Sequence, residues 1–391
     1  MKKRPLSILY LPVDEGGCGW YRIRQWHDLF QGMDNVKSLI MTGKEEDPLE
    51  VIKSADVVVA RIQDYEYVKE IKCNIDPLKP IVFDHDDNTM EVLPTSEHYK
   101  DFGTQDAYAT LKDKDGEVTD IKPVWVTGVT EDFNRHKNLV GQMNMLYLVG
   151  VADLITTPVA NLTQFYMQYA SEACLGAIVP NSINFPMYPE GKFIPKDKKK
   201  KEIRIGWQGG VSHLGDWQEI SKELGEVLEK YPQVTLHIMG SYYKNQFKGF
   251  KDRVTFYPWL PWKAFTYRIK TMGLDGAIIP LESKKFNEYK SEVKFTEFSQ
   301  LGIPCLVKDM LPYSAVCEGG KNCYSYKTGD DFKTYLTKMI EDIASGSKKP
   351  LKYVKEAQKW VREERDSRKT AKAIVDLYKS ILPDEIKEQL I

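Results

Sequence analysis

The sequence predicts an α/β protein with two domains, each built around a parallel, doubly wound sheet. The chain of 391 residues is long enough for two or three domains of about 150 residues each. Short apolar runs alternate with helical segments in both halves, as in parallel sheets covered by helices. Two Gly-rich turns, at 16–19 and 209–210, each follow a strand-like run. We therefore expect ligands at the carboxyl ends of the strands.

The composition is that of a soluble globular protein. Hydrophobic residues make up 42% and charged residues 28% of the chain. A net charge of -1 argues against broad electrostatic affinity for nucleic acid, although it leaves room for a local basic groove. Six cysteines without CxxC spacing indicate reduced thiols and a cytoplasmic location. The apolar run at 6–11 is too short for a signal or membrane segment, so we interpret it as the first strand.

The first Gly-rich turn follows that strand, and a helix is predicted to begin near Trp20. Gly17 and Gly19 would let the backbone approach a ligand closely. The spacing lacks the third glycine of the dinucleotide-binding fingerprint. Tyr21 and Arg22 follow, and we expect them at the ligand-binding edge.

Acidic residues end a later strand of the first half. The run beginning at Pro80 leads into Asp84, Asp86 and Asp87, which should therefore lie at the same edge of the sheet. Asp86 or Asp87 could serve as a base, an orienting group or a ligand of an acceptor hydroxyl. Capping of the next turn by these carboxylates is the structural alternative.

The second half opens with a strand, the turn Gly209–Gly210 and a helix, which is a phosphate-cradling geometry. His213 is the titratable donor in this turn, and Asp216 would cap or orient it. A purely local role, with His213 bonding backbone at the start of the helix, is the other interpretation.

The most informative segment runs from Phe286 to Pro304, after a buried strand. It predicts a helix with Ser291 at the N-cap and Gly302 at its end. Free N–H groups at the helix N-terminus suit a phosphate, and Lys290 and Lys294 lie close enough to assist. Glu297 could accept hydrogen bonds from a ribose diol.

Glu297, Gly302 and Pro304 have the spacing of a known motif. The segment resembles the donor-sugar signature of GT-B glycosyltransferases, in the large retaining group 4-like class. Tyr289 stands where that class has its first glutamate, which contacts the transferred sugar. That role would pass to Asn287, Glu288 or a backbone amide.

The resemblance implies GT-B architecture: two Rossmann-like, doubly wound domains facing a central cleft. The expected boundaries are 1–185 for an acceptor domain with an insertion at 95–145, 186–202 for a linker, 203–365 for a donor domain and 366–391 for a crossover helix returning to the first domain.

The resemblance also implies transfer of a sugar from a nucleotide-sugar to an acceptor hydroxyl, with retention and without a required metal or tightly bound cofactor. UDP is the most frequent nucleotide of the class, and a glycan is the default acceptor. Oligomeric state is not readable from the sequence.

The expected donor-binding residues are Gly17, Gly19, Gly209, Gly210, Trp259, Asn287, Lys290, Ser291, Lys294 and Glu297. The expected catalytic residues are Asp86, Asp87 and His213, and the expected acceptor contacts are Tyr21, Arg22, His98 and Tyr99.

Three alternatives remain open at this point. The acceptor could be a hydroxymethylated base in phage-type DNA. The motif Asp84-His-Asp86 also fits the metal-binding DxD of single-sheet GT-A transferases. Finally, Tyr289 and the lack of an Arg/Lys pair in the Gly209 turn are compatible with a nucleotide-sugar-binding protein that has lost catalysis.

Overall fold

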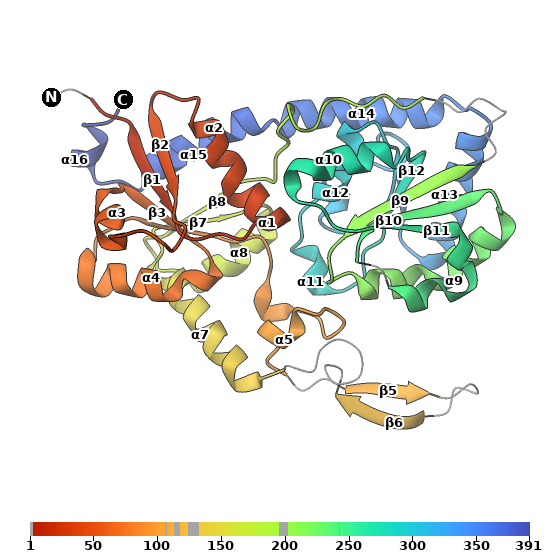
Figure 1. Cartoon of the computed structure of the whole chain (residues 1–391), viewed down its shortest axis with the longest axis horizontal. Coiled ribbons are helices and arrows are strands. Elements are labelled where there is room, and N and C mark those ends of the chain that lie inside the picture. The colour runs from red at the N-terminus through yellow and green to blue at the C-terminus, as the bar shows by residue number, and fades with distance from the viewer. Residues whose placement is uncertain (1–2, 106–107, 113–117, 124–132, 195–201, 242) are drawn as a thin grey trace. The chain divides into compact units, whose positions relative to one another are not determined.

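The computed structural model describes residues 3–105, 108–112, 118–123, 133–194, 202–241 and 243–391 (Figure 1). It contains two compact units. Unit 1 comprises residues 1–87, 141–184 and 365–391, and unit 2 comprises residues 88–140 and 185–364. Parts of the expected insertion (106–107, 113–117 and 124–132) and of the expected linker (195–201) lie outside the described residues.

Unit 1 is built on a six-stranded parallel sheet with the order β2-β1-β3-β4-β7-β8. The strands are β1 (Leu6–Tyr10), β2 (Val36–Ile40), β3 (Val57–Ala60), β4 (Ile81–Asp84), β7 (Leu154–Thr157) and β8 (Leu175–Ile178). The apolar runs of β3 and β4 are buried throughout, as expected for central strands of a parallel sheet.

The helices of unit 1 come from both ends of the chain. They are α1 (Gly17–Gly19), a π-helical turn (Trp20–Arg24), α2 (Gln25–Phe30), α3 (Pro48–Ser54), α4 (Tyr65–Glu70), a second π-helical turn (Ile71–Ile75), α8 (Ala160–Met167), α15 (Ser367–Ser380) and α16 (Asp384–Lys387). Helix α7 (Arg135–Val151) begins in the residues of unit 2 and continues into unit 1. Ile374 and Tyr378 of α15 share one apolar core with Ile8 and Val82. The core of unit 1 therefore depends on the last segment of the chain.

Unit 2 contains the second six-stranded parallel sheet, in the order β11-β10-β9-β12-β13-β14. Its strands are β9 (Ile203–Gly209), β10 (Val234–Gly240), β11 (Val254–Tyr257), β12 (Gly276–Ile279), β13 (Cys305–Lys308) and β14 (Tyr324–Tyr326). Numbered along the chain, this is the strand order 3-2-1-4-5-6 of Rossmann folds. The prediction of two doubly wound α/β domains is confirmed.

The longer helices of unit 2 cover its sheet. They are α9 (Leu214–Lys230), α10 (Trp262–Thr271), α12 (Val293–Gln300), α13 (Gly329–Ala344) and α14 (Lys349–Glu364). Shorter elements are α5 (Tyr99–Phe102), α11 (Lys285–Glu288) and the antiparallel pair β5 (Tyr108–Lys112) and β6 (Val118–Pro123). Within the described parts of the chain, no helix has both the length and the apolar composition needed to cross a bilayer.

The strand order reverses once in each sheet. In unit 1 the reversal lies between β1 and β3, and in unit 2 it lies between β9 and β12. Ligands of doubly wound proteins bind beyond the carboxyl ends of the strands at this position. In unit 2 the site is therefore bordered by the loop after β9 and by the loop between β12 and α12.

Helix α12 ends as the sequence predicts. Gly302 has a φ of +79° and donates its N–H to the carbonyl of Ser299, while Ile303 donates to the carbonyl of Phe298. These two bonds form a Schellman motif. The predicted start is one residue too early, because Glu292, not Ser291, occupies the N-cap position. The N-terminus of α12 nevertheless follows the loop after β12, which borders the switch point of unit 2.

Candidate functional site

The two glycines of the turn after β9 have different surroundings. A Cβ on Gly209 would lie 2.6 Å from the ring of Trp207 and 2.8 Å from the ring of His213. A side chain there would displace His213. By contrast, a Cβ on Gly210 would have no heavy atom within 4 Å. The hydroxyl of Tyr243 fixes this turn, since it donates to the carbonyl of Gly210 and accepts from the N–H of His213, both at 3.1 Å.

His213 connects a carboxylate to a lysine at the start of α9. Its Nδ1 lies 2.6 Å from Oδ2 of Asp216, and its Nε2 lies 2.8 Å from Nζ of Lys294. All three side chains are buried. The Lys294 ammonium also lies 5.4 Å from the ring centroid of Trp207. The expected role of Asp216 in orienting His213 is consistent with this geometry.

The protonation states of this group follow from burial and charge. Burial, together with the charges of Lys294 and Lys290, lowers the pKa of His213 to about 3, so the imidazole is neutral at pH 7. A neutral ring that donates from Nδ1 to Asp216 can accept at Nε2 from the Lys294 ammonium. Burial is also the main reason that the pKa of Lys294 falls to about 7.

Lys290 adds a second cation to the site. Its Nζ is buried and has no hydrogen-bond partner, and it lies 5.0 Å from the ring centroid of Phe286. Its charge helps to lower the pKa values of both His213 and Lys294. Among the described residues, neither lysine forms an ion pair with a carboxylate. Two buried ammonium groups without counter-ions create a site for an anion.

Asp216 also anchors the loop that carries Lys290. Its Oδ1 accepts from the backbone N–H of Glu282 at 2.7 Å and lies 3.5 Å from Nδ2 of Asn287. The same Nδ2 donates to the carbonyl of Glu282 at 2.9 Å. The amide orientation of Asn287 is thereby fixed, and its Oδ1 is left buried without a donor.

Glu297 lies inside α12 with only 3% of its surface exposed. Its Oε1 accepts from the hydroxyl of Tyr188 at 2.7 Å, and its Oε2 accepts from the amide of Gln208 at 2.8 Å. A ribose diol could reach this carboxylate only by joining or replacing these donors. The role of Glu297 as a ribose ligand stays a prediction.

Two other expected donor contacts differ in exposure. Trp259 follows β11 and packs against Phe265 with ring centroids 5.2 Å apart, yet 44% of its surface is exposed. An aromatic ring with one packed and one open side can stack on a nucleobase. Ser291 is half-buried immediately before the N-cap of α12.

Of the two glycines expected to bind the donor in unit 1, Gly19 lies against the carbonyl of Asp14. A Cβ on Gly19 would lie 2.1 Å from that oxygen, so this position requires glycine, whereas Gly17 has open space. Arg61 lies beneath this turn and bonds Asp14 at 3.2 Å and Asp86 at 2.8 Å. The turn and the acidic strand end are thus joined by one guanidinium.

Arg22 does not lie at an exposed ligand-binding edge, contrary to our expectation. It is 1% exposed and makes a two-point ion pair with Asp84, at 3.0 and 2.7 Å. It also donates to the side chain of Asn181, and Thr156 donates to Asp84. Both charges are thus satisfied inside unit 1, and the role of Arg22 as an acceptor contact stays a prediction. Tyr21 is buried as well.

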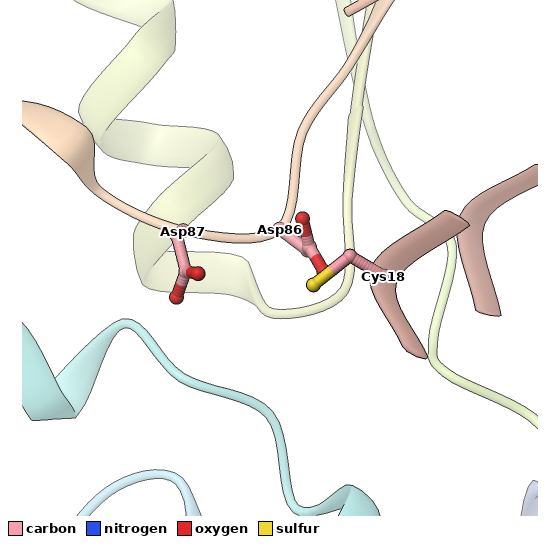
Figure 2. A group of neighbouring side chains, drawn as sticks. All are labelled: Cys18, Asp86 and Asp87. Atoms are coloured by element: carbon pink, nitrogen blue, oxygen red, sulfur yellow. The ribbon is translucent and has the colours of Figure 1, made fainter. Parts of the chain in front are cut away.

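Asp86 and Asp87 lie beside Cys18 at the end of β4. Figure 2 shows the thiol of Cys18 next to the carboxylate of Asp86, with Asp87 further along the loop. One ligand atom from each residue falls within 4.8 Å of the others, the spacing of a possible metal site. However, the carboxylate of Asp86 already forms an ion pair with Arg61. Burial by itself would raise the pKa of Asp86, but the Arg61 and His85 charges and the Cys18 thiol hold it below its usual value.

The expected acceptor contacts His98 and Tyr99 belong to unit 2. Tyr99 is 4% exposed and stacks on Phe133, and its hydroxyl donates to the carbonyl of Gln105. It also belongs to a small apolar cluster with Val92 and Phe286. His98 precedes helix α5 and is exposed.

Sequence reasoning missed four contributors to the unit 2 site. Tyr188 and Gln208 hold Glu297, Tyr243 fixes the glycine turn, and Glu282 binds Asp216 through its backbone. Gln208 could have been noticed, since it directly precedes the Gly-Gly turn at a strand end. The other three act across long sequence separations, which no local pattern reports.

Comparisons with known proteins bear on the fold. No protein-family model matches the chain, and no curated protein matches it by sequence. Among solved structures, Anabaena HepE in complex with UDP-glucose matches with a TM-score of 0.64 and 13% identity, over 96% of this chain and 100% of HepE. Sucrose-phosphate synthase from Thermosynechococcus elongatus matches with a TM-score of 0.61 and 10% identity, over 96% and 99%. A glycosyltransferase from Rickettsia africae has a TM-score of 0.58 and 10% identity, over 96% and 98%.

These matches span both units of the chain. The GT-A alternative is wrong, because it requires a single sheet and an available Asp84, whereas the chain forms two sheets and Asp84 is paired with Arg22. With two parallel six-stranded sheets and full-length similarity to HepE and its relatives, the chain has the GT-B glycosyltransferase fold.

Proposed function

We propose that this protein is a glycosyltransferase that moves a sugar from a nucleoside diphosphate sugar to an acceptor hydroxyl. The observation that carries the proposal is the pair of buried lysines, Lys290 and Lys294, without carboxylate partners at the switch point of unit 2. Two ammonium groups match the two charges of a diphosphate ester. The N-terminus of α12 supplies backbone N–H donors, and the turn at Gly210 has open space beside it.

In this proposal, catalysis comes from positioning and electrostatics. As the bond between sugar and diphosphate breaks, negative charge grows on the leaving group, and Lys290 and Lys294 stabilise that charge in a buried setting. His213 is neutral and holds the Lys294 ammonium in place through Nε2. Retention of configuration and metal independence follow from the resemblance to the group 4-like class.

UDP is the nucleotide that we propose. HepE was solved with UDP-glucose, and it matches this chain along its whole length. The exposed side of Trp259 is the proposed stacking surface for the base, and Glu297 is the proposed ribose contact. In unit 1, Asp86 and Asp87 are proposed to orient or deprotonate the acceptor hydroxyl.

The experiment is nucleotide release from a panel of UDP-, GDP-, ADP- and CMP-sugars, with and without a chelator. We expect release from one donor, unaffected by the chelator and reduced about tenfold or more in Glu297→Ala, as for the loss of about 1.4 kcal/mol of binding. Full activity in that variant would contradict the ribose role. Binding of a donor without any turnover, with or without acceptors, would favour the non-catalytic alternative.

The acceptor is proposed to be a glycan. The DNA alternative predicts acceptor activity that falls steeply as salt rises, because counterions compete for the phosphate backbone. Transfer to a glycan acceptor should show a salt dependence close to that of donor hydrolysis alone. Comparing the salt dependence of donor hydrolysis with that of transfer to a hydroxymethylated oligonucleotide separates the two.

A further inference from the structure

Residues 91–102, which we call the strap, belong to unit 2 and contact two elements of its candidate site. At the start of the strap, Oε1 of Glu91 lies 3.1 Å from Nζ of Lys285 in α11. Further along, Thr95 lies over the first turn of α9, since a Cβ on Gly215 would be 3.3 Å from the Thr95 Oγ1. The strap therefore packs on unit 2 beside the loop that carries Lys290.

An apolar cluster fastens the strap to α11. Val92 and Tyr99 of the strap and Phe286 of α11 form this cluster, and all three side chains are buried. The cluster is separate from the two main apolar cores that the structure describes, one in each unit. Loosening the strap should therefore leave both sheets folded.

Phe286 connects the strap to the charge of Lys290. The Nζ of Lys290 is buried and lies 5.0 Å from the centroid of the Phe286 ring. A cation kept away from water attracts an anion more strongly than a hydrated one, and dissolved salt screens it less. The position of Phe286 therefore affects how strongly Lys290 can bind phosphate.

We propose that the strap is a positioning element of the donor site. Through Val92 and Tyr99 it holds Phe286 against Lys290, so that the ammonium group meets the donor diphosphate without intervening water. This inference rests on the proposed function, because it takes the diphosphate as the ligand of Lys290. It places Tyr99 on the donor side, whereas the resemblance implied an acceptor contact.

The first test uses Val92→Ser, which removes apolar packing between the strap and Phe286. UDP binding is measured by isothermal titration at about 50 and about 500 mM salt. We expect the variant to bind UDP about threefold or more weakly at the lower concentration. Between the two concentrations, its affinity should fall at least about threefold more than that of the wild-type protein, because Lys290 becomes hydrated. Val140→Ser is the matched control, since Val140 is 56% exposed on α7, and it should behave as wild type.

The ion pair at the start of the strap provides a second test. Lys285→Glu should weaken UDP binding, because it sets a like charge against Glu91 and adds negative charge near the donor. Lys285→Glu/Glu91→Lys restores both the pair and the net charge, so UDP affinity should return to the wild-type value. Lys285→Glu/Asp101→Lys restores only the net charge, since Asp101 is exposed on α5, and it should stay about two- to threefold weaker. Equal recovery in the two double variants would overturn the role of the strap.

The remaining outcomes separate this inference from the proposed function. If the wild-type protein binds neither UDP nor any other nucleotide, both fail together. If Lys290→Met weakens UDP binding but Val92→Ser has the salt dependence of the wild-type protein, the strap does not act on Lys290 and the proposed function stands. Thermal unfolding checks that Val92→Ser is folded. If it is not, the two double variants decide, because they change only charges outside the apolar cluster.

Discussion

Lys290 and Lys294 carry charge at positions where charge is costly. Moving an ammonium group out of water is unfavourable unless a counter-ion offsets the loss, and no described carboxylate pairs with either group. The carboxylates nearby are already engaged, Asp216 by His213 and Glu297 by Tyr188 and Gln208. The protein thus keeps two cations in an unfavourable environment that an anionic ligand would relieve.

The first prediction concerns Lys290→Met. Because the variant removes an unpaired buried charge, its free energy of unfolding should rise by on the order of 1 kcal/mol. Its affinity for UDP should fall by about tenfold or more, since a charge-assisted contact to phosphate is lost. Thermal unfolding and titration with UDP measure the two effects. Lys284→Met is the control, because Lys284 is exposed on the same loop, and neither property should change.

The second prediction concerns pH. Lys294 has a pKa lowered to about 7, mainly by burial, so the free protein carries this charge below pH 7 and loses it above. Affinity for a UDP-sugar, whose diphosphate does not titrate in this range, should therefore decrease as the pH rises from 6 to 9. Titration at several pH values checks this. Lys294→Met should bind weakly and with little pH dependence; an equally steep dependence in that variant would assign the titration to another group.

The same pKa has an opposite consequence for stability. Unfolding restores Lys294 to its ordinary pKa near 10.4, so the unfolded chain binds more protons than the folded one between about pH 7 and 10. The contribution of this residue to stability therefore increases as the pH rises through that window. Subtracting the pH profile of Lys294→Met from that of the wild-type protein isolates it.

Sequence patterns located the cations but not their partners. Lys290 and Lys294 were predicted because they flank the start of a helix, which is a local feature. The contacts of Asp216 with Glu282 and Asn287 span 66 and 71 positions, so they depend on which strands become neighbours. The same limit explains why the ion pair of Arg22 with Asp84, 62 positions away, was not predicted.

At the scale of elements, the position of α12 depends on how its ends are formed. Its C-terminus is set by Gly302, whose positive φ closes the Schellman motif and whose missing side chain lets Gly191 approach. This end was predictable, because Gly followed by Ile-Pro is a strong local stop signal. The start was placed one residue early, since Ser291 and Glu292 are both acceptable before a helix and tertiary contacts decide between them.

The third prediction tests that end. In Gly302→Ala the new Cβ would meet the backbone of Gly191 at 2.7 Å, at a φ that alanine rarely adopts. We expect a loss of about 1–3 kcal/mol in unfolding free energy. Gly141→Ala is the matched control in α7, where a Cβ has open space and should stabilise the helix by about 0.5–1 kcal/mol. Denaturant titration of both variants gives the comparison. If both substitutions changed the unfolding free energy equally, the turn at Gly302 would have rearranged to accommodate the alanine side chain.

At the scale of the whole molecule, the chain builds two separate cores, and the order of segments links them. Most of unit 2 is one continuous segment, residues 185–364, to which residues 88–140 are added. Unit 1 is completed only by the last segment, residues 365–391. The alternation of strands and helices predicted both sheets, because each sheet is a run of local βα repeats. The sequence analysis placed the insertion at 95–145 in the first domain, whereas residues 88–140 cluster with unit 2. The sequence of this segment has no strong periodicity that would have indicated its unit.

The final prediction follows from this unequal construction. Ile374 of α15 is 1% exposed in the core of unit 1, so Ile374→Ala should cost about 2–4 kcal/mol in the stability of that unit. Among the residues that the structure describes, the main core of unit 2 contains none from α15, so the stability of unit 2 should be unaffected. Calorimetry should then show one transition moved to lower temperature and one unchanged, with UDP raising only the unchanged one. Lys372→Ala, on the exposed side of the same helix, should move neither. If Ile374→Ala instead lowers a single transition that UDP also raises, the two cores unfold as one cooperative unit, and donor binding in unit 2 would stabilise the entire chain.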